Sequence, residues 1–179
     1  MIRAARHQFS VNGFAGTSFT SVAAEAGVDV KLVRYYFSTK EALFDAAVTV
    51  PDEFRGRVRS ALEAPIEERG RALVRCFTEA WKDAPLAESL RAALLIAGHE
   101  ERALELLRAN FESTLIHAVE ESVPTDERLL RATLITSQIL GFSFARNIYR
   151  FAPAVDLDEE VVIDTVGATV QRYLTGPLT

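Results

Sequence analysis

Residues 9–44 read FSVNGFAGTSFTSVAAEAGVDVKLVRYYFSTKEALF, and this stretch decides the fold. Two short helical patterns lie on either side of Gly27, a residue that can adopt the positive φ needed to redirect the chain. The apolar stripe of the first pattern consists of Phe19, Val22, Ala23 and Ala26. Its small alanines allow a neighbouring helix to approach closely. Two short helices around a tight turn predict a helix-turn-helix.

The second helix of this unit has an outer face suited to nucleic acid. Val30, Val33 and Phe37 are spaced to face the core, whereas Lys31, Arg34 and Tyr35 fall together on the opposite side. Such a helix fits the major groove, where Lys and Arg donate to guanine edges or phosphates and Tyr contacts a phosphate or a thymine methyl. Hydroxyl and ammonium groups at helix ends can hold the phosphate backbone. The residues expected to contact DNA are Thr17, Thr20, Lys31, Arg34, Tyr35, Tyr36 and Lys40.

The distribution of charge along the chain permits DNA binding, although the negative net charge does not suggest it. The chain of 179 residues carries a net charge of −5, with +3 in residues 1–40 and −8 in the remainder. A basic head on an acidic body can present phosphate-binding charge locally while the rest of the molecule repels DNA. Two cations on a short helix are also a common solvated face, so charge alone leaves both interpretations open.

Short motifs at fixed spacing identify the first 45 or so residues more specifically. The motifs are Gly13-Phe14, Thr17-Ser18, Val22-Ala23, Ala26-Gly27-Val28, Tyr36-Phe37 and Lys40-Glu41-Ala42-Leu43-Phe44. This pattern resembles the DNA-binding domain of the TetR family. The segments 138–142, 145–147 and 171–176 also resemble a C-terminal domain type found in one branch of that family.

The resemblance implies an all-α, TetR-like protein with two domains. Residues 1–46 would form a three-helix helix-turn-helix DNA-binding domain, and residues 47–179 a helical ligand-binding and dimerisation domain. The implied function is that of a transcriptional regulator, most often a repressor. It would bind a palindromic double-stranded DNA operator as a homodimer and be released by a small apolar ligand. The signal would pass through the helices at 39–63, with Pro51 as a candidate pivot.

The chain departs from the family pattern at two places. Many members carry Tyr where this chain has Arg34, which favours a base contact over the usual phosphate contact at that position. Relatives also have a basic arm before the first helix, whereas Arg3 lies almost inside it. Either an arm is missing from this sequence, or affinity depends on fewer phosphate contacts.

Helical periodicity continues through the rest of the chain, and no alternating β pattern interrupts it. Asn12-Gly13, Ala26-Gly27 and the prolines mark the boundaries between helices. The expected helices lie near residues 1–12, 18–26, 30–37, 39–49, 52–63, 66–83, 86–97, 100–122, 125–151 and 158–175.

A long uncharged segment predicts the homodimer. Residues 132–145, ATLITSQILGFSFA, place apolar groups around the whole helix, which must therefore be covered on both sides. One side can pack within its own subunit, and the other needs a partner. The apolar helix near 158–175 is its natural companion, because two helices from each subunit make a four-helix interface under twofold symmetry.

Aromatic and isolated polar residues on the middle helices suggest a small-molecule cavity, although the same residues also describe an ordinary core. The candidates for ligand binding are Phe77, Trp81, Asn110, Phe111, Thr114, His117, Phe142 and Asn147.

Other function classes lack support. No nucleophile elbow, zinc-protease motif or Gly-rich phosphate loop occurs, so we expect no enzyme, no cofactor and no metal site. Cys76 is the single cysteine and is expected to be a buried apolar residue. The apolar runs are too short for a membrane span, and no signal peptide is apparent, which together predict a cytoplasmic protein. The alternative function is a helical small-molecule-binding module without operator binding.

Overall fold

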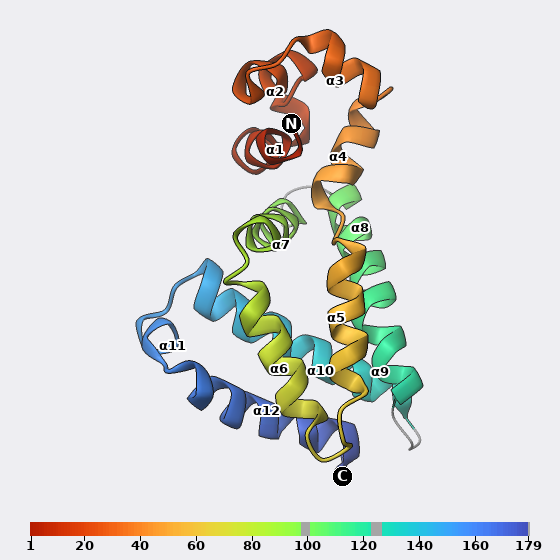
Figure 1. The fold of residues 1–179 in the computed structure, drawn as a ribbon, viewed down its shortest axis with the longest axis vertical. Helices are drawn as coiled ribbons and strands as arrows, with labels where there is room; N and C mark the ends of the chain where they lie inside the picture. Colours follow the sequence, from red (N-terminus) through yellow and green to blue (C-terminus); the bar gives the residue numbers. More distant parts are fainter. Residues whose placement is uncertain (98–100, 123–126, 179) are drawn as a thin grey trace. The chain divides into compact units, whose positions relative to one another are not determined.

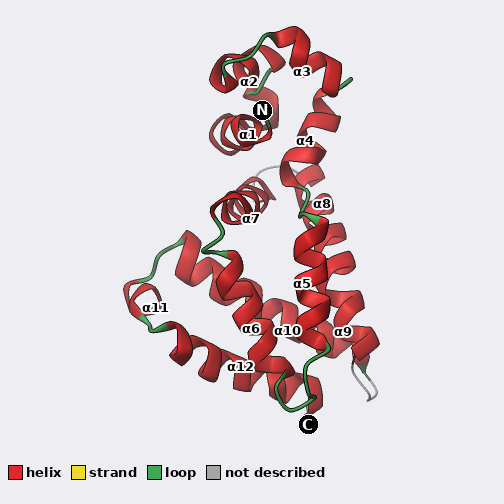
Figure 2. Cartoon of the chain, viewed as in Figure 1, coloured by secondary structure: helices red, strands yellow, loops and turns green. Residues whose placement is uncertain are grey.

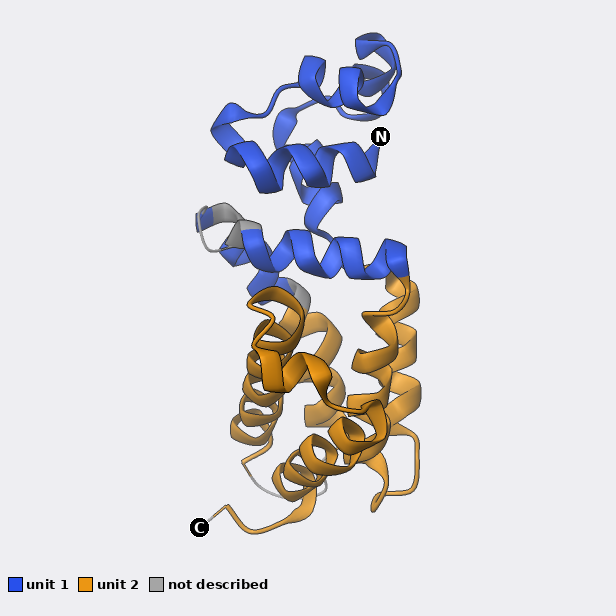
Figure 3. Ribbon diagram, turned by 90° about the vertical axis from the view of Figure 1, so that its left-hand side faces the viewer, with its two compact units in different colours: residues 1–50, 84–110 blue, residues 51–83, 111–179 orange. Residues whose placement is uncertain are grey.

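The structure is a computed structural model that describes residues 1–97, 101–122 and 127–178, without the side chains of 96, 97, 102, 103 and 110. Figure 1 traces the chain, and Figure 2 shows that every regular element drawn is a helix. Within the described residues, the all-α class is therefore confirmed. Contacts divide the chain into two compact units, residues 1–50 with 84–110 and residues 51–83 with 111–179 (Figure 3).

The first unit is formed by the N-terminal helices and by two helices from the middle of the chain. Its elements are α1 (Ile2–Gly16), α2 (Phe19–Ala26), α3 (Val30–Tyr36), α4 (Lys40–Val48), α7 (Ala84–Ala97) and most of α8 (Glu101–Phe111). Helix α1 packs against α2, α4 and α7. Phe9 and Phe44 are completely buried and meet edge to face, with ring centroids 4.9 Å apart. Phe14 packs on the same Phe44 ring at 5.2 Å, so one aromatic cluster holds α1 to α4.

Helix α1 bends before it ends. Gly13 has φ 67° and ψ 179°, a conformation that L side chains rarely adopt, and one further helical turn follows it up to Gly16. The sequence predicted a helix end at Asn12-Gly13, whereas the chain only changes direction there. The bend brings Phe14 onto Phe44, which accounts for glycine immediately before an aromatic residue.

The second unit contains the remaining elements. They are α5 (Asp52–Leu62), α6 (Arg69–Ala80), the π-helical turn η1 (Glu112–Ile116), α9 (His117–Ser122), α10 (Arg128–Ser143), the π-helical turn η2 (Phe144–Ile148), α11 (Ala152–Asp156) and α12 (Glu159–Thr175). Helix α12 packs along α6 and against α10. A Cβ atom on Gly70 would lie 2.4 Å from the carbonyl oxygen of Gly167, so α6 and α12 approach each other more closely than larger residues would allow.

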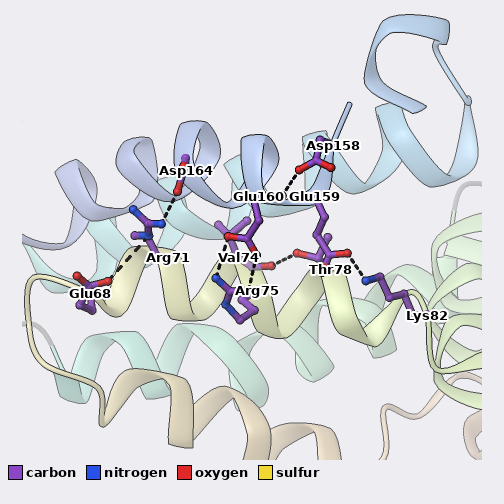
Figure 4. A network of polar contacts seen from close by, with 10 residues as sticks. All are labelled: Glu68, Arg71, Val74, Arg75, Thr78, Lys82, Asp158, Glu159, Glu160 and Asp164. Carbon is purple, nitrogen blue, oxygen red and sulfur yellow. Dashed lines mark hydrogen bonds and ion pairs between the residues drawn. The ribbon is translucent and has the colours of Figure 1, made fainter. Parts of the chain in front are cut away.

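Polar contacts line the same helix pair (Figure 4). Arg75 holds Glu160 with two bonds of 2.7 and 3.2 Å, and Arg71 pairs with Asp164 at 2.5 Å. At the far end Gln171 accepts the backbone N–H of Gly70 at 2.8 Å. These contacts fix the register of α12 along α6, which matters because both helices contribute to the cavity described below.

The structure differs from the sequence prediction mainly in the second half of the chain. The helix expected over 125–151 is α10 followed by η2, and the separate short helix α11 was not predicted. The helix expected over 100–122 is divided into α8, η1 and α9. Packing also groups α7 and most of α8 with the first fifty residues.

Candidate DNA-recognition helix and ligand cavity

Local hydrogen bonds define the two helices of the predicted DNA-binding motif. Ser18 caps α2 by accepting the N–H of Ser21 at 3.0 Å, and the Ser21 hydroxyl accepts the N–H of Ser18 in return. Gly27 ends α2 with φ 65° and ψ 34°. Asp29 then caps α3 by accepting the N–H of Lys31 at 2.7 Å. The end of α2 and the start of α3 are thus both capped, which defines the short turn of a helix-turn-helix.

One face of α3 is buried and the opposite face is open. Val33 is completely buried in the core of the first unit, whereas Lys31, Arg34 and Tyr35 are exposed, Tyr35 to 81%. The Arg34 guanidinium stacks over the Phe19 ring at 5.2 Å. Among the described residues, the side chains of Lys31 and Arg34 form no hydrogen bond or ion pair, so their N–H groups remain available.

The acidic groups near this face are occupied elsewhere. The Asp29 carboxylate is used by the α3 cap. Glu25 accepts a hydrogen bond from Gln8 at 2.6 Å and lies 2.8 Å from Nδ1 of His7, and these contacts lower the pKa of its carboxyl. Both bonds to Glu25 come from α1. Neither carboxylate forms an ion pair with Lys31 or Arg34, so the cationic groups of the outer face of α3 are not held by a local acid.

The other residues expected at the DNA surface fall into two groups. Thr20 and Tyr36 are exposed, and the Tyr36 ring packs edge-on against Tyr35 at 5.3 Å. Thr17 is only 2% exposed and donates its hydroxyl to the carbonyl of Gly13 at 2.8 Å, so its side chain stabilises the bend in α1. Lys40 donates to the carbonyl of Ala15 at 3.2 Å and lies 4.5 Å from the centroid of the Phe14 ring.

A cavity of about 220 Å³ lies within the second unit, between α6, α10, η2 and α12. Its apolar wall is formed by Val74, Phe77, Trp81, Ile139, Phe142, Val162 and Val166. Its polar wall is formed by Thr78, Lys82, Ser143, Arg146, Asn147 and Glu159. An apolar enclosure with a few polar groups is the usual composition of a small-molecule site.

The charged groups of the cavity differ in their pairing. Lys82 and Glu159 form an ion pair with each other (Figure 4). Arg146 donates from Nη2 to the carbonyl of Leu157 at 3.0 Å. Its Nη1 is shielded from solvent and meets no hydrogen-bond acceptor within the described part of the chain. The cavity thus contains one guanidinium whose charge is not balanced by a carboxylate.

The cavity includes four of the eight residues expected to bind a ligand, namely Phe77, Trp81, Phe142 and Asn147. Phe111, Thr114 and His117 lie on the segment from the end of α8 to α9 and do not line it. Thr114 is buried and His117 is exposed. The side chain of Asn110 lies outside the described residues.

Sequence reasoning missed most of the polar wall. Val74, Phe77, Thr78 and Trp81 recur at helical spacing, so the full face of α6 could have been found by extending the Phe77–Trp81 pair by one turn. Arg146 gave a weaker signal, because it is one charge directly after an uncharged run. Nothing in the sequence indicated that Glu159 would meet Lys82 across α6 and α12.

Helix-turn-helix geometry with an exposed cationic face, on a chain that also has a separate helical unit, is the architecture of a DNA-binding regulator. Two family descriptions match this chain: bacterial regulatory proteins, tetR family, over residues 1–47, and the tetracyclin repressor-like C-terminal domain over residues 67–174. The chain belongs to the TetR family of transcriptional regulators, whose members are DNA-binding regulators and not enzymes.

Individual relatives agree with this assignment. The uncharacterized HTH-type transcriptional regulator YdgC of Bacillus subtilis (strain 168) is 33% identical over 70 residues, which is 39% of this chain. That match spans only 34% of the relative's own length. A TetR-family regulator from Streptomyces coelicolor A3 has a similar structure, with a TM-score of 0.64, 23% identity and coverage of 97% of this chain and 91% of that one.

A third similar structure is that of the multidrug binding protein EbrR complexed with imidazole, with a TM-score of 0.67 and 23% identity. The similarity covers 99% of this chain and 89% of that one. At these identities the structural neighbours establish a shared fold. No helix in the described residues is both long enough and apolar enough to span a membrane.

Proposed function

We propose that this protein is a repressor that binds a palindromic operator as a homodimer and releases it when a small, largely apolar ligand enters the cavity of the second unit. The observation that carries the proposal is the exposed face of α3, where Lys31, Arg34 and Tyr35 lie together and neither cation forms an ion pair among the described residues. In a helix-turn-helix, the second helix enters the major groove.

The contacts fall into two kinds. Arg34 and Lys31 have N–H groups that suit guanine O6 and N7, and Tyr35 can reach a thymine methyl or a phosphate. Thr20 and Tyr36 carry exposed hydroxyls that can bind phosphates and set the orientation of the helix. We leave Thr17 out of the contacting set because its hydroxyl is already bound to Gly13, and Lys40 can contribute a phosphate contact only if it leaves Ala15.

Selection of bound duplexes from a random DNA pool, followed by fluorescence anisotropy at stated salt, tests this assignment. We expect a palindrome to be enriched, and we expect Arg34→Ala and Tyr35→Ala each to weaken its binding about fivefold or more, since one good base contact is worth about 1–3 kcal/mol. Arg59→Ala, which removes an exposed arginine from α5, is the matched control and should bind normally. Full affinity in the α3 variants would refute the role of this face.

The faces of α10 and α12 support the dimer. In α10, Ile135 and Ile139 are buried, while Leu130 is 47% exposed and Ser137 and Gly141 face outward without charge. A Cβ on Gly141 would meet nothing within 4 Å in the single chain, which leaves room for a partner helix. Val161 on α12 is 45% exposed. A homodimer carries two α3 helices, and dimeric helix-turn-helix proteins bind half-sites about 34–36 Å apart.

Light scattering at micromolar concentration tests the dimer. Wild-type protein should have the mass of two chains, and Ser137→Arg should reduce it to that of one chain, because a charge at a packed helix interface has no partner. Ser60→Arg places the same charge on an exposed position of α5 and should leave the mass unchanged. A wild-type monomer would contradict the proposal.

The ligand role of the cavity can be tested with its own residues. Phe142→Ala should abolish the response of operator binding to a ligand found by screening, because Phe142 lines the cavity. Phe111→Ala removes an aromatic side chain that does not line it and should retain the response. The alternative, a small-molecule-binding module without operator binding, shares this cavity but predicts no enriched DNA, so the duplex selection separates the two functions.

A further inference from the structure

We infer that the cavity of the second unit takes a small carboxylic acid in its anionic form, with an apolar body against Trp81, Phe77 and Phe142 and its carboxylate directed at Arg146. This inference rests on the proposed ligand role of the cavity and specifies the chemical class of the ligand.

The charges on the cavity wall do not cancel. Three ionisable side chains line the cavity, and two of them, Lys82 and Glu159, neutralise each other. Arg146 is half-buried and forms no ion pair among the described residues. An arginine keeps its charge under all ordinary conditions. The wall therefore carries one uncompensated positive charge next to an apolar space, where the low dielectric strengthens its attraction for an anion.

One nitrogen of the Arg146 guanidinium, Nη1, has no hydrogen-bond acceptor among the described residues. A guanidinium has five N–H donors, and the only hydrogen bond that this side chain makes within the described residues is from Nη2 to the carbonyl of Leu157. Nη1 is shielded from solvent and unpaired, a state that costs free energy in the absence of a ligand. A carboxylate in the cavity would supply the missing acceptor once the guanidinium turns toward the space that it borders. Guanidinium and carboxylate match in geometry as well as in charge.

The size of the cavity limits the body of the ligand. An apolar protein cavity of about 150 Å³ is large enough for benzene. The present cavity of about 220 Å³ therefore has room for a single ring with one carboxylate, or for an aliphatic acid of similar volume. Its aromatic and branched lining, with Phe77 and Trp81 on α6 and Phe142 on α10, suits such a body.

Benzoate and benzamide make the sharpest pair of probes, since they have nearly the same shape and differ in charge. Trp81 is the only tryptophan in the chain and lines the cavity, so its fluorescence reports occupancy directly in the full-length protein. We expect benzoate to bind wild-type protein at least about tenfold more tightly than benzamide, because hydrogen bonds to charged groups contribute more than neutral ones.

Two substitutions assign the preference to one side chain. In Arg146→Gln the ratio of the two dissociation constants should fall to near one, while benzamide still binds. Arg150→Gln removes an exposed arginine four residues away that does not line the cavity, and should keep the wild-type ratio. Arg146→Lys keeps the charge without the planar fork and should retain only part of the preference. Circular dichroism of each variant shows whether it is folded. The comparison of benzoate with benzamide on wild-type protein does not depend on any variant folding.

Equal binding of benzoate and benzamide to wild-type protein would overturn the inference while leaving the cavity as a ligand site. A preference for benzoate that survives in Arg146→Gln would also overturn it. If neither compound binds, the inference is overturned as well, because benzoate has the size and charge that it requires. The proposed function is tested separately, by the selection of operator DNA and by the ligand response of Phe142→Ala, so it can stand when the inference fails.

Discussion

Gly27 shows how a single backbone conformation sets the recognition helix. The residue has φ 65°, and a Cβ placed on it would meet no atom within 4 Å, so only the backbone conformation opposes a substitution. Gly27→Ala should therefore lower the free energy of unfolding by about 1–2 kcal/mol. Gly56 has equal space but lies inside α5, where alanine is the better helix former, and Gly56→Ala should raise stability slightly. Urea titrations followed by circular dichroism compare the two; equal effects would contradict this account.

Cys76 should behave as an apolar core residue rather than as a reactive thiol. Burial raises the pKa of its thiol to about 11, so at pH 8 the reactive thiolate is scarce in the folded protein. We expect iodoacetamide to label native protein at pH 8 much more slowly than protein in urea, where the thiol regains its ordinary pKa. Labelling at the same rate in both states would show that Cys76 is accessible.

At the scale of residues, the sequence predicted the motif well because local rules govern it. Gly13, Gly27 and the Ser18 cap each follow from the conformation of one or two residues. Thr17 was predicted at the DNA surface from its place at a helix end, yet its hydroxyl turns inward to Gly13. The sequence predicted a helix end at Asn12-Gly13, but not the further helical turn up to Gly16 after which Thr17 donates back to Gly13.

At the scale of elements, the pair α6 and α12 is the main packing contact of the second unit, and close approach rather than charge stabilises it. The ion pairs of Arg71 and Arg75 with α12 are largely exposed and contribute little. In contrast, a Cβ on Gly70 would lie 2.4 Å from the carbonyl oxygen of Gly167 and 2.6 Å from the backbone nitrogen of Gln171. Neither backbone atom can move without displacing α12.

Gly70→Ala should therefore destabilise the protein by about 1–3 kcal/mol, the usual range for overpacking. Glu160→Gln, which removes the carboxylate that Arg75 holds, should cost much less at neutral pH. Chemical denaturation of both variants, with Gly56→Ala as the control for adding a methyl group, provides the test. A greater loss in Glu160→Gln would mean that the ion pairs hold the helices together.

Helix existence was predictable from sequence for most elements, and helix interruption was not. Periodicity extends without a break across Ser143, yet the chain forms the π-helical turn η2 from Phe144 to Ile148, and this turn carries Arg146 and Asn147 into the cavity wall. Half of the predicted ligand residues line the cavity, and these lie on α6, directly after it, on α10 or on its direct continuation. The rest of the wall depends on how helices meet, which one sequence does not specify.

At the scale of the whole molecule, three covalent connections join the two units, at residues 50–51, 83–84 and 110–111. The connection at 83–84 joins a helix that lines the cavity to a helix of the first unit. Helix α6 carries Phe77 and ends beside Trp81, both in the cavity wall, and α7 begins at Ala84. Helix α7 in turn packs against α1 and α4 of the DNA-binding unit. We predict that a ligand in the cavity acts on the first unit through this connection between α6 and α7.

Two glycines inserted between Asp83 and Ala84 test this route. The insertion should leave the affinity for operator and the affinity for ligand near their wild-type values, because it alters neither surface. The factor by which ligand weakens operator binding should fall to near one, since a flexible joint cannot transmit a displacement. By linkage, the effect of operator on ligand affinity must vanish to the same extent, so both measurements should agree. The same insertion between Glu63 and Ala64 stays within the second unit and should preserve the coupling. If the coupling survives the insertion at Asp83, the signal passes instead through one of the other two connections, at 50–51 or at 110–111.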